Sequence, residues 1–125
     1  MIHLDANFLI AGVNRTSGEA RAIERWLQRG ESLACSTITW SEFLNGPVSP
    51  AQIATAREFL SAGFADFEEV HAVRAADLFN GTGRSRRLKF DCLIAAAAMV
   101  AGADFATCNV DDFRLFVPHG LVLAT

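Results

Sequence analysis

The sequence lacks the cysteine spacing that marks disulfide frameworks and thiolate metal sites. Cys35, Cys92 and Cys108 are odd in number, and no two of them form a C-x-x-C motif. The pattern therefore indicates neither a disulfide-stapled fold nor a cysteine-ligated zinc site. All three cysteines lie in apolar stretches, so we expect them to be buried small side chains of a protein in a reducing compartment.

Long apolar runs and other common site motifs are also missing. No stretch reaches the ~18 uncharged apolar residues of a membrane span. No basic segment precedes Asp5, so a secretory signal is not indicated and we expect a cytoplasmic protein with no membrane segment. The three histidines are scattered, which disfavours a histidine zinc site. Neither a phosphate-binding P-loop nor the G-x-S-x-G nucleophile motif occurs.

The chain also lacks an overall positive charge. Its formal net charge is −3 and 51% of its 125 residues are hydrophobic, which is enough for a single core. Any contact with nucleic acid must therefore be local. We expect one domain over residues 1–125, with no linker, internal repeat or low-complexity segment.

Short apolar runs alternate with segments of helical periodicity. Strands are expected at residues 2–4, 32–36, 67–70, 104–107 and 121–123. Helices are expected after the capping patterns that begin at Thr16, Thr39 and Ser49, over residues 72–79 and 90–101, and briefly after Asn109. This order predicts an α/β fold, with a mostly parallel central sheet of about five strands and helices on both faces.

The most unusual segment is the predicted helix over residues 90–101. It has no polar face, because four consecutive alanines are combined with leucine, isoleucine, methionine and valine. A helix that is apolar all round belongs inside a domain. Asp91 would therefore stand at the head of a buried helix, where it either interacts with the helix dipole or forms part of a site.

Four acidic residues fall at the edge of the predicted sheet where the parallel strands end. Asp5 ends the first strand and Glu42 follows the second, while Asp91 heads the buried helix. Asp112 follows the strand at residues 104–107, with Asn109 three residues before it on the same side of a helical turn. Ligands of open α/β sheets bind at this edge.

Each acid taken alone also fits a structural role. Glu42 and Asp112 could be capping acids, and Asp91 a partner of the helix dipole. Asp5 fits such a role least, because a carboxylate at the end of a central strand would be partly buried. Carboxylates crowded at one edge disfavour one another's charge unless a cation neutralises them. A hard dication such as Mg²⁺ or Mn²⁺ suits oxygen ligands.

These residues resemble, in order and spacing, the four acidic motifs of the PIN-domain ribonucleases. The motifs are Asp5-Ala6-Asn7, Ser41-Glu42-Phe43, Asp91-Cys92-Leu93-Ile94-Ala95-Ala96 and residues 107–113. The chain is similar to the VapC toxins of bacterial toxin-antitoxin pairs over nearly its full length. Residues 47–80 match only in general helical character.

The resemblance implies a Mg²⁺- or Mn²⁺-dependent endoribonuclease that forms a homodimer and is blocked by a VapB-like antitoxin. The metal-binding acids of the family fall on Asp5 and Asp91, with Glu42 beside them. The fourth position of the family falls around Asn109 and Asp112. An amide stands at the first of these places and an acid at the second, so either could contact the metal or its water.

The mechanistic hypothesis follows from these assignments. Asp5 and Asp91 would hold the metal, while Glu42 and Asp112 would hold its waters or a second ion. The ion would stabilise the phosphoryl oxygens and acidify a water, which suits a site without a histidine base. The neighbouring polar residues expected to support the acids or the substrate are Asn7, Thr107 and Asn109.

The only basic cluster stands directly before Asp91. It consists of Arg84, Arg86, Arg87 and Lys89. These side chains could contact the RNA backbone without base specificity, and a solvated loop explains them equally well.

Two other functions stay open on the sequence. A haloacid-dehalogenase-type phosphatase also places an aspartate after its first strand, but that chemistry needs D-x-D and the third residue here is Asn7. A non-catalytic PIN-like module that binds RNA or a protein would not need all four acids. The presence of all four acids argues against such a module, and an assay for RNA cleavage would distinguish it from a nuclease.

Overall fold

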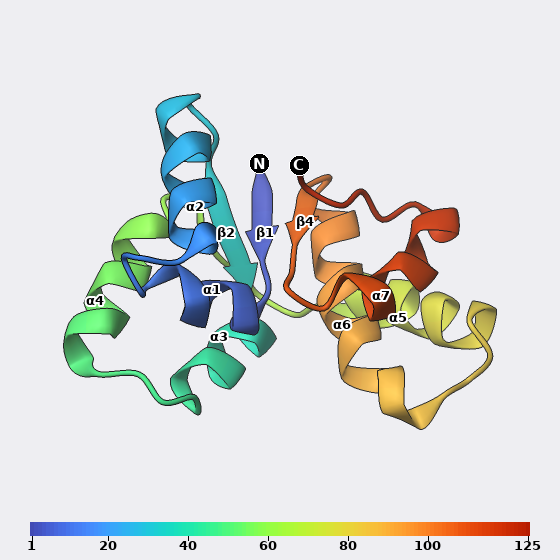
Figure 1. Ribbon diagram of the computed structural model, residues 1–125. Helices are drawn as coiled ribbons and strands as arrows, with labels where there is room; N and C mark the ends of the chain where they lie inside the picture. The colour runs from blue at the N-terminus through green and yellow to red at the C-terminus, as the bar shows by residue number, and fades with distance from the viewer.

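A parallel sheet of four strands forms the centre of the molecule (Figure 1). The computed structural model describes residues 1–125. The strands are β1 (Ile2–Leu4), β2 (Leu33–Ser36), β3 (Gly63–Ala65) and β4 (Asp104–Ala106), in the spatial order β3-β2-β1-β4. Every residue of β1 and β2 is buried, as expected for central strands covered on both faces.

Helices cover both faces of this sheet. They are α1 (Ala6–Gly12), α2 (Gly18–Gln28), α3 (Thr37–Leu44), α4 (Pro50–Phe59), α5 (Glu69–Gly81), α6 (Lys89–Val100) and α7 (Val110–Phe113), with short 3-10 helices at Arg86–Leu88 and Arg114–His119. In Figure 1, α1, α2 and α4 lie on one side of the strands and α5, α6 and α7 on the other. The predicted α/β architecture is therefore confirmed.

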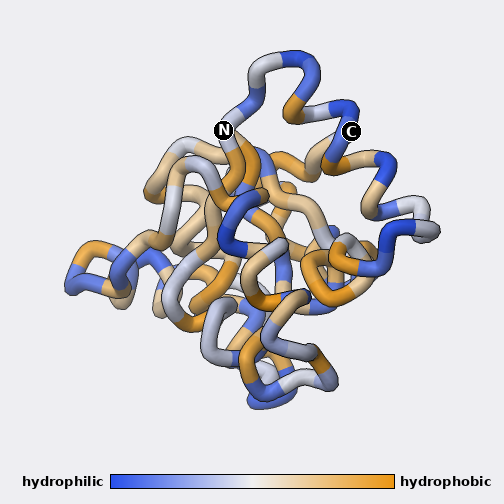
Figure 2. Tube along the Cα trace, turned by 90° about the vertical axis from the view of Figure 1, so that its left-hand side faces the viewer, coloured by the Kyte–Doolittle hydropathy of each residue, from blue (hydrophilic) through white to orange (hydrophobic).

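Two hydrophobic clusters fill the space between the sheet and its helices. One gathers around Leu4, Ile23 and Phe43, and the other around Phe105 and Phe113. The apolar stretches of the chain run mostly through the interior in Figure 2. No helix combines the length and the apolar character needed to cross a membrane.

Helix α6 has the buried position that its composition predicted. Its four consecutive alanines are at most 1% exposed, and the helix packs against α5. Gly102 follows with a φ of +66°, a left-handed conformation that favours glycine after a helix end. Asp91 is therefore the third residue of a helix that the core holds in place.

The strand predictions at residues 67–70 and 121–123 are wrong. The edge strand lies earlier, at Gly63–Ala65, because Glu69 already belongs to the first turn of α5. Residues 121–123 make a single bridge, Leu123 to Phe105, because the chain reaches the sheet only after the turn at Gly120. The sheet therefore has four strands where about five were expected.

Two helix starts and one cysteine also differ from expectation. Ser36 caps α3 by accepting a hydrogen bond from the Thr39 N–H at 3.1 Å, so the helix begins before Thr39. Ser17, rather than Thr16, caps α2. In both cases the serine is the residue with extended backbone beside the helix. Cys108 is exposed, because it lies in the loop after β4 and not in a strand.

Candidate acidic site

The strands all end at one edge of the sheet, and several helices begin there. In Figure 1 the arrows of β1 and β2 point toward the region where α1 and α3 start, and α6 also begins on that side. α1 follows β1 after one residue, and α3 follows β2 directly. This arrangement brings residues from distant parts of the sequence to one edge.

Asp5 occupies the single position between β1 and α1. It is 5% exposed, and its Oδ1 accepts a hydrogen bond from the Ala6 N–H at 2.9 Å. Its Oδ2 accepts a hydrogen bond from the Thr107 hydroxyl at 2.7 Å, and that hydroxyl accepts one from the Asn109 N–H at 2.9 Å. Burial raises the pKa of Asp5, while the bonds from Thr107 and Ala6 oppose the rise.

Glu42 and Asp91 face the same region from α3 and α6. Burial raises the pKa of Glu42, and the negative charges of Asp5 and Asp91 raise it further. Burial, followed by the charges of Asp5 and Asp112, raises the pKa of Asp91 to about 6, while Arg87 partly offsets them. These effects show that Asp5, Glu42 and Asp91, from three separate parts of the chain, lie near enough for their charges to act on one another.

Asp112 differs from the other acids because a cation accompanies it. Its Oδ1 accepts a hydrogen bond from Arg87 at 3.0 Å, and its Oδ2 accepts one from the Asn109 side-chain amide at 2.9 Å. These bonds from Arg87 and Asn109 lower the pKa of Asp112. The two residues that compete for the fourth position of the motif thus contact each other at the margin of the site.

Asn7 lies in the first turn of α1. Its side-chain oxygen accepts a hydrogen bond from the Cys108 N–H at 3.2 Å. This contact ties α1 to the loop that carries Thr107 and Asn109. The predicted supporting polar residues therefore connect the two segments that follow the neighbouring strands β1 and β4.

The basic cluster does not act as one surface. Arg87 reaches the site through Asp112, whereas Arg84 turns back to the Asn80 side chain and lies over Phe79. Lys89 also lies over Phe79, at 5.7 Å from the ring centroid. Arg86 is exposed. Sequence reasoning missed the Arg87–Asp112 ion pair, because nothing in the spacing of the two residues marks it.

The acidic residues fit a divalent cation in chemistry, although their side chains do not form a closed cage. No group of three or more histidine, cysteine, aspartate or glutamate side chains lies close enough to hold one ion. The donor set nevertheless consists of carboxylate oxygens, and burial together with mutual repulsion raises the pKa values of Glu42 and Asp91. A hard cation with oxygen ligands would relieve the repulsion among Asp5, Asp91 and Glu42.

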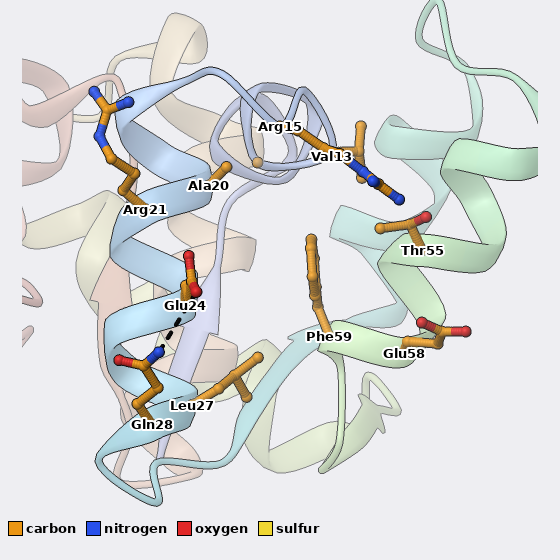
Figure 3. Close-up of a pocket in the computed structure, with 11 residues that line it drawn as sticks. Val13, Arg15, Ala20, Arg21, Glu24, Leu27, Gln28, Thr55, Glu58 and Phe59 are labelled. Carbon is orange, nitrogen blue, oxygen red and sulfur yellow. Dashed lines mark hydrogen bonds between the residues drawn. The ribbon is translucent and has the colours of Figure 1, made fainter.

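A hollow lies away from the acids, between α2 and α4 (Figure 3). It has a volume of about 620 Å³. Val13, Leu27 and Phe59 provide apolar side chains, and Arg21 and Glu58 are among the charged residues around them. None of the acids at the strand ends lines it, so it is a second surface feature and not part of the acidic site.

Several solved structures have the same fold. The chain aligns with VapBC2 of Rickettsia felis, bound to a promoter DNA fragment, at a TM-score of 0.73 and 20% identity, over 99% of this chain and 98% of that one. DNA-bound VapBC of Salmonella typhimurium aligns at 0.72 and 21% over 98% and 96%. A toxin-antitoxin complex from Klebsiella pneumoniae aligns at 0.67 and 23% over 90% of each chain.

No curated protein sequence matches the chain. The model of the PIN domain family, however, matches residues 2–116, which include all four acidic motifs. This match supports hydrolysis of nucleic acid as the activity of the site. Together with the four-stranded parallel sheet and the carboxylates gathered at its edge, it shows that the chain belongs to the PIN domain family.

Proposed function

We propose that this protein is a divalent-metal-dependent endoribonuclease and the toxin of a VapBC-type toxin-antitoxin pair. The observation that carries the proposal is that Asp5, Glu42 and Asp91 lie at the same edge of the sheet, where burial and then one another's charges raise the pKa values of Glu42 and Asp91. Such an arrangement is unfavourable for the protein alone and favourable with a bound dication. Membership of the PIN domain family agrees with this assignment.

Each residue of the acidic site would have its own part in holding the metal ion. Asp5 and Asp91 would hold Mg²⁺ or Mn²⁺, with Glu42 beside them, and Thr107 would hold the Asp5 carboxylate in place through its hydroxyl. When bound, the ion would supply charge stabilisation of the phosphoryl oxygens and a more acidic water. Asp112 would lie at the margin, and Asn109 would orient its carboxylate.

Arg87 is the basic residue best placed for the RNA backbone. Its guanidinium bonds only one oxygen of Asp112, and its side chain is 64% exposed. An exposed guanidinium retains donors for a phosphate. We propose that the contribution of Arg84, Arg86 and Lys89 is weaker and purely electrostatic, because Arg84 and Lys89 pack against Phe79.

Two protein partners belong to the same proposal. The solved neighbours include toxin-antitoxin complexes, and the hollow between α2 and α4 offers an apolar floor with charges of both signs for a VapB-like segment.

The homodimer is supported by Val70 and Val73, which lie one turn apart on α5 and are 51% and 52% exposed. Gel filtration of the purified chain tests the dimer, and Phe59→Arg tests the hollow by loss of copurification with a candidate antitoxin.

The central test incubates purified protein with total cellular RNA in Mg²⁺ and in EDTA. We expect cleavage in Mg²⁺, none in EDTA, and none with Asp91→Asn in either buffer. Binding of RNA without cleavage in any metal would favour the alternative of a non-catalytic PIN-like module. Hydrolysis of phosphate monoesters without cleavage of RNA would favour the phosphatase alternative.

A further inference from the structure

A second hollow adjoins the acidic site and has no role in the scheme above. It has a volume of about 340 Å³ and lies between α3 and the start of α6, two helices that are in contact. The lining residues are Thr37, Ile38, Ser41, Glu42, Asn45 and Phe90. Glu42 belongs both to this hollow and to the acidic cluster, so the two spaces share a wall.

Phe90 is the most unusual residue of this lining. It is 59% exposed, although it directly precedes Asp91 in the first turn of a helix whose remaining apolar side chains are largely buried. Leaving an aromatic ring in water forgoes a large part of the free energy that burying it would provide. The buried body of α6 also holds the ring, so it is presented beside the acids on a rigid element.

The rest of the lining combines the partly buried Ile38 with three polar side chains that are open to solvent. Thr37, Ser41 and Asn45 are exposed on α3 or at its end. Two hydroxyls and an amide provide both donors and acceptors of hydrogen bonds. An aromatic face next to such groups suits a flat ligand that has polar edges and a π-face, which describes a nucleobase.

We propose that Phe90 stacks on the unpaired base of a nucleotide adjoining the scissile phosphate, with Asn45, Ser41 and Thr37 at the edge of that base. The inference rests on the proposed nuclease function. A phosphate held at the acids places its own nucleoside within reach of the wall formed by Glu42. Only an unpaired base exposes its face for stacking, so the substrate class is single-stranded RNA.

The first test compares steady-state cleavage of a short single-stranded RNA by variants at this position. Because base–aromatic stacking contributes to substrate binding, Phe90→Ala should raise KM by about 10-fold and leave kcat within about threefold. Phe90→Tyr should keep the wild-type KM, whereas Phe90→Leu should resemble Phe90→Ala because it lacks a π-face. Leu44→Ala removes an exposed apolar side chain of α3 outside the hollow and should change neither constant.

The second test removes the base instead of the ring. An oligonucleotide with an abasic nucleotide next to the cleavage site should lose affinity for the wild type and lose nothing further with Phe90→Ala. Equal KM values for wild type and Phe90→Ala would overturn the proposal. So would a shift of Phe90→Ala to a smaller species in gel filtration, because Phe90 would then be a contact between copies of the chain.

A binding measurement separates this inference from the nuclease assignment. Affinities for the same RNA are compared between Asp91→Asn and the double variant Asp91→Asn with Phe90→Ala, neither of which is expected to cleave. A weaker affinity of the double variant supports the stacking role, whether or not the wild type proves to be a nuclease. Equal affinities overturn it, even if the wild type cleaves RNA.

Discussion

The buried histidines and the buried or half-buried carboxylates at the strand ends differ in how they avoid the cost of a charge inside the protein. His3, in the middle of β1, is 2% exposed and His71 on α5 is 6% exposed. Burial, followed by the charges of His71 and the N-terminus, lowers the pKa of His3 to about 4. The Nδ1 atom of His71 accepts a hydrogen bond from the Glu68 N–H at 2.9 Å, as a neutral imidazole does.

The carboxylates at the strand ends have no such solution. The pKa of Asp91 rises only to about 6, so at pH 7 it is still mostly ionised, beside Asp5 and Glu42. His3 therefore avoids the cost of a buried charge by staying unprotonated at neutral pH, whereas Asp91 keeps its negative charge there. The comparison indicates that His3 has a structural place in the sheet, and it supports the proposal that the carboxylates form a cation site.

The largest expected effect is the loss of catalysis when the acidic cluster loses one charge. Asp91→Asn should reduce RNA cleavage by on the order of 10³-fold or more, because the ion loses a ligand that supplies several kcal/mol of stabilisation. Asp111→Asn is the matched control, since Asp111 is 94% exposed in a surface ion pair and should retain full activity. Retained cleavage by Asp91→Asn would contradict the site, and calorimetric titration with Mg²⁺ would report the lost affinity directly.

The next effect concerns the histidines and acid stability. The folded-state pKa of His3 lies below the ordinary histidine value of 6.5, so its contribution to stability is complete above pH 6.5 and is lost as the pH falls toward 4. This difference in pKa corresponds to about 3 kcal/mol in the free energy of unfolding. His3→Leu should remove most of this loss, as seen in urea unfolding at pH 7 and pH 4.5. An equal loss in the variant and the wild type would show that His3 is not the group responsible.

A smaller effect is expected at the hydroxyl that positions Asp5. Thr107→Val deletes the hydrogen bond to Asp5 Oδ2 and should lower cleavage by about 10-fold, because a hydrogen bond to a charged group is worth about 1.5–3 kcal/mol. The Mg²⁺ concentration needed for half-maximal rate should rise in parallel. Thr107→Ser keeps the hydroxyl and should restore both values. If the variant lost thermal stability but kept its Mg²⁺ dependence, the role of Thr107 would be only structural.

The smallest effect is on the stability of the metal-free protein. Because the folded-state pKa of Asp91 is raised from 3.8 to about 6, its contribution is complete below pH 3.8 and is lost as the pH rises through 6. In EDTA at pH 7.5, Asp91→Asn should therefore be more stable than the wild type by about 1 kcal/mol, after allowance for solvent screening. The difference should disappear below pH 4, and Mg²⁺ should stabilise only the wild type. A difference independent of pH would exclude charge repulsion as its cause.

Parts of the fold were predictable where local chemistry acts alone. The apolar helix around Asp91, the capped start of α4 at Ser49 and the alternation of strands and helices all follow from composition and periodicity. The edge strand was misplaced, because residues 67–70 have strand-like composition but lie in the loop and first turn of α5. Residues 121–123 were predicted as a strand for a related reason. They have strand-like composition, but they make only one bridge, because a strand also needs a neighbour that pairs along its length.

The sequence by itself determined that this is an α/β protein with acids at the ends of its strands, because apolar periodicity and helix capping operate between near neighbours. Only the tertiary structure decided which charges act on one another. Arg87 meets Asp112 across 25 positions, Thr107 meets Asp5 across 102, and Phe90 faces a hollow built by α3. Such contacts depend on how the strands are ordered in space, and no local pattern records that order.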